Sequence, residues 1–148
     1  MMVMNTLVRR CFMKYCGPSV AKASRVESCT SEGFLERTGF YGMDSTFFKC
    51  TATAHYDGFS LGENCLLDRC TARWNLMGDG ITISGTNNIV RRSVISHNLG
   101  GIYVGSGARG TLIQNNTISV NGRAFDDCCG GLYLDGDDTI VRLSLIHI

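Results

Sequence analysis

Short apolar runs recur along this chain at intervals of roughly 20 residues, which lies in the range of solenoid repeats. The repetition is clearest in residues 80–83, 101–104 and 131–134, where a glycine precedes alternating apolar and polar positions. Such alternation is typical of a strand with one buried face. Apolar residues at helical spacing persist nowhere, so the pattern predicts β-structure and no helices.

Each repeat contains three short strands separated by turns. Aligned repeats share a column of small residues: Cys11, Cys29, Cys50, Cys70, Ser93 and Asn116. A mainly apolar column precedes it by three positions: Val8, Val26, Phe47, Leu67, Val90 and Ile113. Another follows it by two: Met13, Ser31, Ala52, Ala72, Ile95 and Ile118. These columns predict an all-β solenoid of about six coils, whose stacked side chains form the core.

The cysteines and asparagines predict turn structure. Four of the eight cysteines lie in the small column, which favours a buried stack of free thiols, with a disulfide as the alternative. Asn75, Asn98 and Asn121 recur five positions after that column and predict a ladder of turn asparagines, because asparagine tolerates a left-handed backbone and bonds to backbone groups. His55 takes this place one coil earlier.

Neither a metal nor a cofactor is predicted. Cys128 and Cys129 have no second Cys or His pair at zinc-finger spacing. The acidic turn at residues 135–138 lacks the glutamate that a calcium loop carries. Residues 105–110 match a dinucleotide fingerprint literally, but a strand follows them where the fingerprint requires a helix.

The composition argues against nucleic acid and a membrane as partners. The net charge of +1 gives no sign of a nucleic-acid surface, and no apolar run approaches the roughly 20 residues of a membrane span. The first ten residues do not form a signal peptide, and nothing indicates an oligomer.

Two segments, Asn115-Asn116-Thr117-Ile118 and residues 97–104, resemble repeats of right-handed parallel β-helix proteins of the pectate-lyase-like class. The resemblance covers about residues 6–142 and implies that fold. The class includes polysaccharide lyases, polygalacturonases, epimerases and non-catalytic repeat proteins. It implies a polysaccharide partner and an extracellular or periplasmic location. Two functions stay open: the saccharide-facing segment of a carbohydrate-active protein, with enzymatic activity undecided, or a structural or adhesive repeat.

The two ends of the sequence determine the expected bounds of the β-helix segment. Residues 1–142 form the predicted β-helix segment, which we expect to be incomplete at both ends because no cap precedes the first strand. Residues 143–148 resemble the translation of a sequencing adapter, so we expect a non-native tail that still keeps a strand-like apolar pattern.

The candidate catalytic residues are Asp57 and Asp79. Each precedes the glycine that opens a third strand, so stacking in register brings the two carboxylates together. Their contexts resemble two aspartate motifs of polygalacturonases, although Gly80 stands where that family has a second aspartate.

The candidate saccharide-binding residues are Tyr41, Tyr103, Tyr133 and Arg123. The three tyrosines share the outer face of the third-strand sheet, where aromatic rings can stack on sugars. Arg123 belongs to an insertion, residues 122–129, that we expect beside this face, where it would meet a uronate carboxylate. A basic row of Arg10, Lys49, Arg69 and Arg92 follows another edge and is interpreted as solvated surface, with acidic polysaccharide as the alternative.

Overall fold

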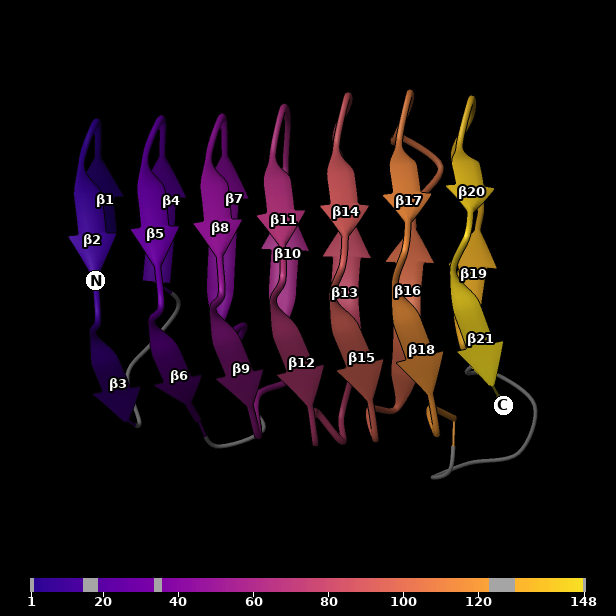
Figure 1. Cartoon of the computed structure of the whole chain (residues 1–148), viewed down its shortest axis with the longest axis horizontal. Coiled ribbons are helices and arrows are strands. Elements are labelled where there is room, and N and C mark those ends of the chain that lie inside the picture. The colour runs from indigo at the N-terminus through magenta and orange to yellow at the C-terminus, as the bar shows by residue number, and fades with distance from the viewer. Residues whose placement is uncertain (1, 15–18, 34–35, 123–129, 148) are drawn as a thin grey trace.

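In the computed structural model, the chain is one stack of coils, each made of three short strands (Figure 1). The structure describes residues 2–14, 19–33, 36–122 and 130–147. Their strands, β1 to β21, fall in turn into three sheets of seven strands each, and all pairings are parallel. The coils follow one another along the long axis, with the two ends of the chain at opposite ends of the stack.

The three sheets are named A, B and C. Sheet A consists of β1 (Met2–Met4), β4 (Ser19–Lys22), β7 (Phe40–Met43), β10 (Phe59–Leu61), β13 (Asp79–Ile83), β16 (Gly100–Val104) and β19 (Leu132–Leu134). Sheet B consists of β2 (Leu7–Arg9), β5 (Arg25–Glu27), β8 (Thr46–Phe48), β11 (Leu66–Asp68), β14 (Ile89–Arg91), β17 (Leu112–Gln114) and β20 (Ile140–Arg142). Sheet C consists of β3 (Phe12–Lys14), β6 (Thr30–Glu32), β9 (Thr51–Thr53), β12 (Thr71–Arg73), β15 (Val94–Ser96), β18 (Thr117–Ser119) and β21 (Leu145–His147).

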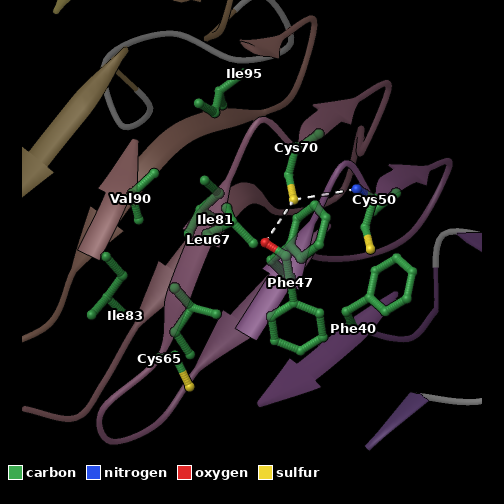
Figure 2. Close-up of a cluster of buried hydrophobic side chains, with 14 of the residues drawn as sticks. Phe40, Phe47, Cys50, Cys65, Leu67, Cys70, Ile81, Ile83, Val90 and Ile95 are labelled. Atoms are coloured by element: carbon green, nitrogen blue, oxygen red, sulfur yellow. Dashed lines mark hydrogen bonds between the residues drawn. The ribbon is translucent and has the colours of Figure 1, made fainter. Parts of the chain in front are cut away.

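Side chains from all three sheets meet inside the coils (Figure 2). The register confirms the predicted apolar columns, for example Phe47 beside Leu67 and Leu67 beside Val90. Phe40 and Phe59 stack with ring centroids 5.1 Å apart, and Phe47 packs edge-on against Phe59. Burying each large apolar side chain stabilises the fold by about 1.5–3 kcal/mol. Stacking therefore supplies the core that no single coil has.

The small-residue column is a hydrogen-bonded ladder. The Cys50 amide donates to Cys70 Sγ at 3.4 Å, the Cys70 amide to Ser93 Oγ at 3.1 Å, and the Ser93 amide to Asn116 Oδ1 at 2.9 Å. Figure 2 shows the first of these bonds. Cys29, Cys50 and Cys70 are buried, and the cysteines that the structure describes are free. The predicted thiol stack is confirmed for these three residues.

The asparagine ladder is also confirmed, and its bonds run along the stack. Asn98 Oδ1 accepts from the Asn75 amide at 3.1 Å and from Asn75 Nδ2 at 2.8 Å. Asn98 in turn donates its amide and its Nδ2 to Asn121 Oδ1, both at 3.0 Å, and its Nδ2 also to the Ala72 carbonyl at 3.1 Å. The His55 amide donates to Asn75 Oδ1 at 2.9 Å.

The prediction that these asparagines adopt a left-handed backbone conformation is wrong. Within the described ranges, positive φ occurs at the residue before each one: Trp74 at 60°, His97 at 57° and Val120 at 57°. The preceding residue makes the sharp bend, which leaves the buried asparagine free to bond to the next coil.

A third ladder lies between sheets A and B, and the sequence alignment missed it. The Ser24 amide donates to Ser45 Oγ at 3.2 Å, and the Cys65 amide donates to Asn88 Oδ1 at 2.9 Å. Ser, Cys and Asn thus serve one function: each offers a side-chain acceptor to the amide of the preceding coil.

The predicted all-β class and three-strand repeat are confirmed, while the count of about six coils was one short of the seven observed. The columns did not include the last coil, where Val141 of β20 continues the column of Ile113 and Ile146 of β21 continues that of Ile118. In the tail, β21 pairs with β18 and the Asn116 amide donates to Ser144 Oγ at 3.3 Å, so the apolar pattern is placed as a strand. Residues 123–129, including Arg123, lie outside the described residues.

Candidate functional site

The outer face of sheet A carries the predicted row of side chains. The register places Tyr41 beside Ser60, Ser60 beside Thr82, Thr82 beside Tyr103, and Tyr103 beside Tyr133. A groove of about 560 Å³ lies along this row, and both predicted aspartates and two of the three tyrosines line it. The structure therefore brings Asp57, Asp79, Tyr103 and Tyr133 together.

The two aspartates are joined by a backbone hydrogen bond. The Asp79 amide donates to Asp57 Oδ1 at 2.9 Å across one coil. Since neighbouring coils are about 4.8 Å apart, equivalent atoms of the two side chains are offset by about that distance along the stack.

Two glycines make room for the carboxylates. A Cβ atom at Gly78 would lie 2.4 Å from Asp57 Oδ1, and one at Gly100 would lie 1.9 Å from Asp79 Oδ1. Each carboxylate therefore occupies the space that a side chain on the next coil would need. The two carboxylates lean in the same direction along the groove.

Burial dominates the electrostatics of this pair. It raises the pKa of Asp57, while the hydrogen bond from the Asp79 amide opposes the rise. Burial, together with the nearby charge of Asp57, raises the pKa of Asp79 to about 6. The pair can therefore hold a proton on Asp79 in mildly acidic solution, with Asp57 the more acidic member.

The tyrosines form an exposed aromatic surface beside the carboxyl groups. The Tyr103 and Tyr133 rings are stacked, with centroids 5.4 Å apart and ring planes 19° apart. Tyr133 is 57% exposed, so its ring is accessible to a ligand. Tyr41 shares the row but is not among the residues that line the groove.

Four lining residues were missed from the sequence: Tyr56, Met77, Leu99 and Ile102. Tyr56 and Met77 are half exposed, in turns that lead into β10 and β13. Exposed apolar residues in turns were the available signal. Thr82 also lines the groove, and its side chain opposes the rise in the pKa of Asp57.

Two residues near the aspartates in sequence face the core instead. His55 is buried and its Nε2 lies 2.9 Å from Ser31 Oγ, and burial lowers its pKa, which keeps it neutral. A Cβ atom at Gly80 would meet Ile95 Cγ2 at 2.5 Å inside the coil. A second aspartate at position 80 would consequently point away from the groove.

No cluster of three or more His, Cys, Asp or Glu side chains suited to a metal occurs within the described ranges. Those same ranges contain no helix of the length and hydrophobicity that a membrane span requires.

Comparison with known proteins identifies the family. A search of curated proteins finds no match. Among solved structures, the A-module of mannuronan C-5 epimerase AlgE4 from Azotobacter vinelandii is similar, with a TM-score of 0.62 at 13% identity over 97% of this chain. The chain spans 60% of that structure, and the likeness at this identity concerns the fold. The family model for the right-handed beta helix region matches residues 39–147. The chain therefore belongs to the right-handed β-helix family.

Proposed function

We propose that the groove on sheet A binds an oligosaccharide. The observation that supports this proposal is that the stacked Tyr103 and Tyr133 rings line the same groove as the carboxyl groups of Asp57 and Asp79. Aromatic faces pack on sugar rings, and carboxylates accept hydrogen bonds from sugar hydroxyls. A protein named as an epimerase of mannuronan has a similar fold, which agrees with this proposal without naming the sugar.

The carboxyl pair gives the groove a candidate acid and base. Asp79, with its pKa raised to about 6, is the proton donor of the pair, and Asp57 is the acceptor. Two carboxyl groups with different proton affinities are the arrangement that glycoside chemistry uses. The offset of about one coil is close to the roughly 5 Å separation that is typical of a double displacement.

The lining favours a sugar without acidic groups. The described residues that line the groove include two aspartates and no lysine or arginine. A uronate carboxylate would therefore meet negative charge unless Arg123 enters the groove, and that contact stays a prediction.

The test compares neutral and uronate hexasaccharides on a glycan array, followed by calorimetry on the best ligand. Tyr103→Ala should weaken binding by about 1 kcal/mol or more, because a stacked ring is lost. Arg92→Ala, at the corner after β14 of sheet B, should leave binding to a neutral ligand unchanged. If the double variant Tyr103→Ala/Tyr133→Ala binds like the wild type, the groove is not the binding site.

Activity is measured on the same ligand. Product formation that is lost in Asp79→Asn, with binding retained, supports a catalytic pair. Binding without turnover supports a non-catalytic segment. Absence of binding to every glycan tested favours the structural or adhesive repeat.

A further inference from the structure

Positively charged side chains are concentrated where the sheet B strands end, although the whole chain is nearly neutral. We call this region the basic edge of sheet B. This basic edge consists of eight side chains. Seven lie at or just after the last residue of a sheet B strand: Arg9, Arg10, Lys49, Arg69, Arg91, Arg92 and Arg142. The eighth, Arg25, begins β5 and reaches this end of the strand through its ion pair with Glu27. Glu27 and Asp68 are the acids in the same rows. Eight cations against two acids give a formal charge of +6, whereas the whole chain carries +1.

Each of the two acids on this edge already pairs with two arginines. Glu27 pairs with Arg9 at 2.6 Å and also with Arg25. Asp68 Oδ2 lies 2.9 Å from Arg91 Nη2 and 3.0 Å from Arg92 Nη2. Each carboxylate thus holds two guanidinium groups, so both clusters keep a net positive charge.

Between these clusters, three cations from three coils surround one aromatic ring. Lys49 Nζ lies 5.2 Å from the Phe48 ring centroid, and the Arg25 and Arg69 Cζ atoms lie 5.8 Å and 5.9 Å from it. Neither Lys49 nor Arg69 forms an ion pair within the part of the chain that the structure describes. Cations held this close repel one another, and an anion bound between them relieves the repulsion.

The geometry of the row fits a linear ligand. Arg10, Ser28, Lys49, Arg69 and Arg92 occupy the same corner in successive coils, about 4.8 Å apart. At Ser28, where the row lacks a long side chain, a depression of about 400 Å³ opens against Arg9, Arg10 and Glu27. A chain with closely spaced anionic groups can therefore run along the stack and place one group in this depression.

The scarcity of aromatic rings on the basic edge favours an acidic polysaccharide over a single-stranded nucleic acid. Single-stranded nucleic acids bind proteins through bases that stack on exposed aromatic rings. Among the described residues at the ends of the sheet B strands, Phe48 is the single aromatic residue. Three cations lie close to its ring, which leaves little of it for a base to stack on. Arginine forks, by contrast, suit carboxylate and sulfate groups directly.

We propose that the basic edge of sheet B binds a linear anionic polysaccharide, carboxylated or sulfated, independently of the groove on sheet A. The probes are a heparin decasaccharide, a polygalacturonate decasaccharide, a neutral dextran oligosaccharide and an oligothymidylate. Fluorescence anisotropy over a range of salt concentrations measures each affinity. The two acidic glycans distinguish a sulfate from a carboxylate ligand.

The decisive variant is Lys49→Gln/Arg69→Gln. It should weaken acidic-glycan binding at least tenfold and reduce the slope of log affinity against log salt by about 1.5, since two charges at roughly 0.7–0.9 each are lost. Lys22→Gln/Arg109→Gln removes two exposed cations away from the edge and should change affinity less than twofold. Tyr103→Ala/Tyr133→Ala, which tests the groove, should leave this binding intact.

Three results would overturn the proposal: no binding of either acidic glycan, tighter binding of oligothymidylate than of both glycans, or equal losses in the two charge variants. Circular dichroism of each variant confirms that the β-structure is retained. Loss of acidic-glycan binding in the groove variant would also contradict it, because the two sites would then not be independent.

Discussion

The backbone amide of Asp79 donates to the carboxylate of Asp57 at 2.9 Å, while the carboxylate of Asp79 itself lies over Gly100 in the following coil. One aspartate is thus stabilised in its charged form by an amide, whereas Asp79 has no such bond within the described residues. Burial and the charge of Asp57 consequently raise the pKa of Asp79 to about 6. The asymmetry separates the two carboxyl groups in proton affinity, although their sequence contexts are alike.

Stability should therefore depend on pH through Asp79. Between the ordinary aspartate pKa and about 6, the folded chain holds a proton that the unfolded chain releases. The contribution of Asp79 to the free energy of unfolding should fall as pH rises through this window and should not change further above it. Urea unfolding at pH 4 to 7 measures the effect. Asp79→Asn should flatten the profile, whereas Asp135→Asn, at an exposed site, should not. An Asp79→Asn profile parallel to that of the wild type across this window would refute the assignment.

Gly100 should be needed because of the Asp79 carboxylate. A Cβ atom there would lie 1.9 Å from Asp79 Oδ1, so Gly100→Ala should destabilise the protein by about 1–3 kcal/mol. In an Asp79→Ala background the overlap is gone, and the same change should cost much less. A double-mutant cycle by chemical denaturation measures the coupling. Equal costs in both backgrounds would show that another contact explains the glycine.

The sequence predicted those features of the fold that repeat from coil to coil. The columns through Phe47 and Cys50 recur at nearly constant spacing, so alignment alone places them in the core. The ladder through Ser45 and Asn88 was missed, because loops of unequal length precede it and its members change from Ser to Cys to Asn.

For the site, the sequence placed Asp57 beside Asp79 because each has the same position relative to a third strand. It did not predict Met77 and Leu99 in the groove, because their turns do not repeat. Nor did it show that Tyr41 lies beyond the groove. Which strands border a cavity depends on the shapes of neighbouring loops, and a strand register carries no information about them.

Asn98 should be among the most sensitive ladder positions. Its side chain makes four hydrogen bonds inside the stack, to Asn75, Asn121 and Ala72. Asn98→Ala leaves several buried polar groups unpaired at about 1–3 kcal/mol each, so the loss should reach about 3 kcal/mol or more. Asn87→Gly is the matched control at an exposed corner with φ of 56°, a conformation that glycine adopts freely. Thermal and urea unfolding of both variants give the comparison, and similar losses would contradict a structural ladder.

The thiol column should be chemically silent in the folded protein. Cys29, Cys50 and Cys70 are buried, whereas Cys11 is half-buried. Burial raises the pKa of Cys29 to about 11 and that of Cys70 above its ordinary range, so these two thiols form little reactive thiolate at neutral pH. The hydrogen bond with Cys70 lowers the pKa of Cys50, so Cys50 is protected by its exclusion from solvent. Iodoacetamide labelling followed by peptide mass spectrometry should modify Cys11 before the other three, which should react only after denaturant is added. Rapid labelling of Cys29, Cys50 and Cys70 in the native protein would contradict a buried thiol stack.

The same column makes a prediction about substitution at Cys50. Its Sγ lies 3.3 Å from the Val26 carbonyl and 3.6 Å from the Phe48 carbonyl, which accept weak hydrogen bonds from the thiol. Serine can donate to the same oxygens, so Cys50→Ser should cost about 1 kcal/mol. Aspartate would place a charge beside two carbonyl oxygens in a site that is 1% exposed, at a cost of roughly several kcal/mol. Denaturant midpoints measure the difference, and Glu32→Gln in sheet C serves as a surface control. If Cys50→Asp is as stable as Cys50→Ser, the site is open to water and the core does not continue through this corner.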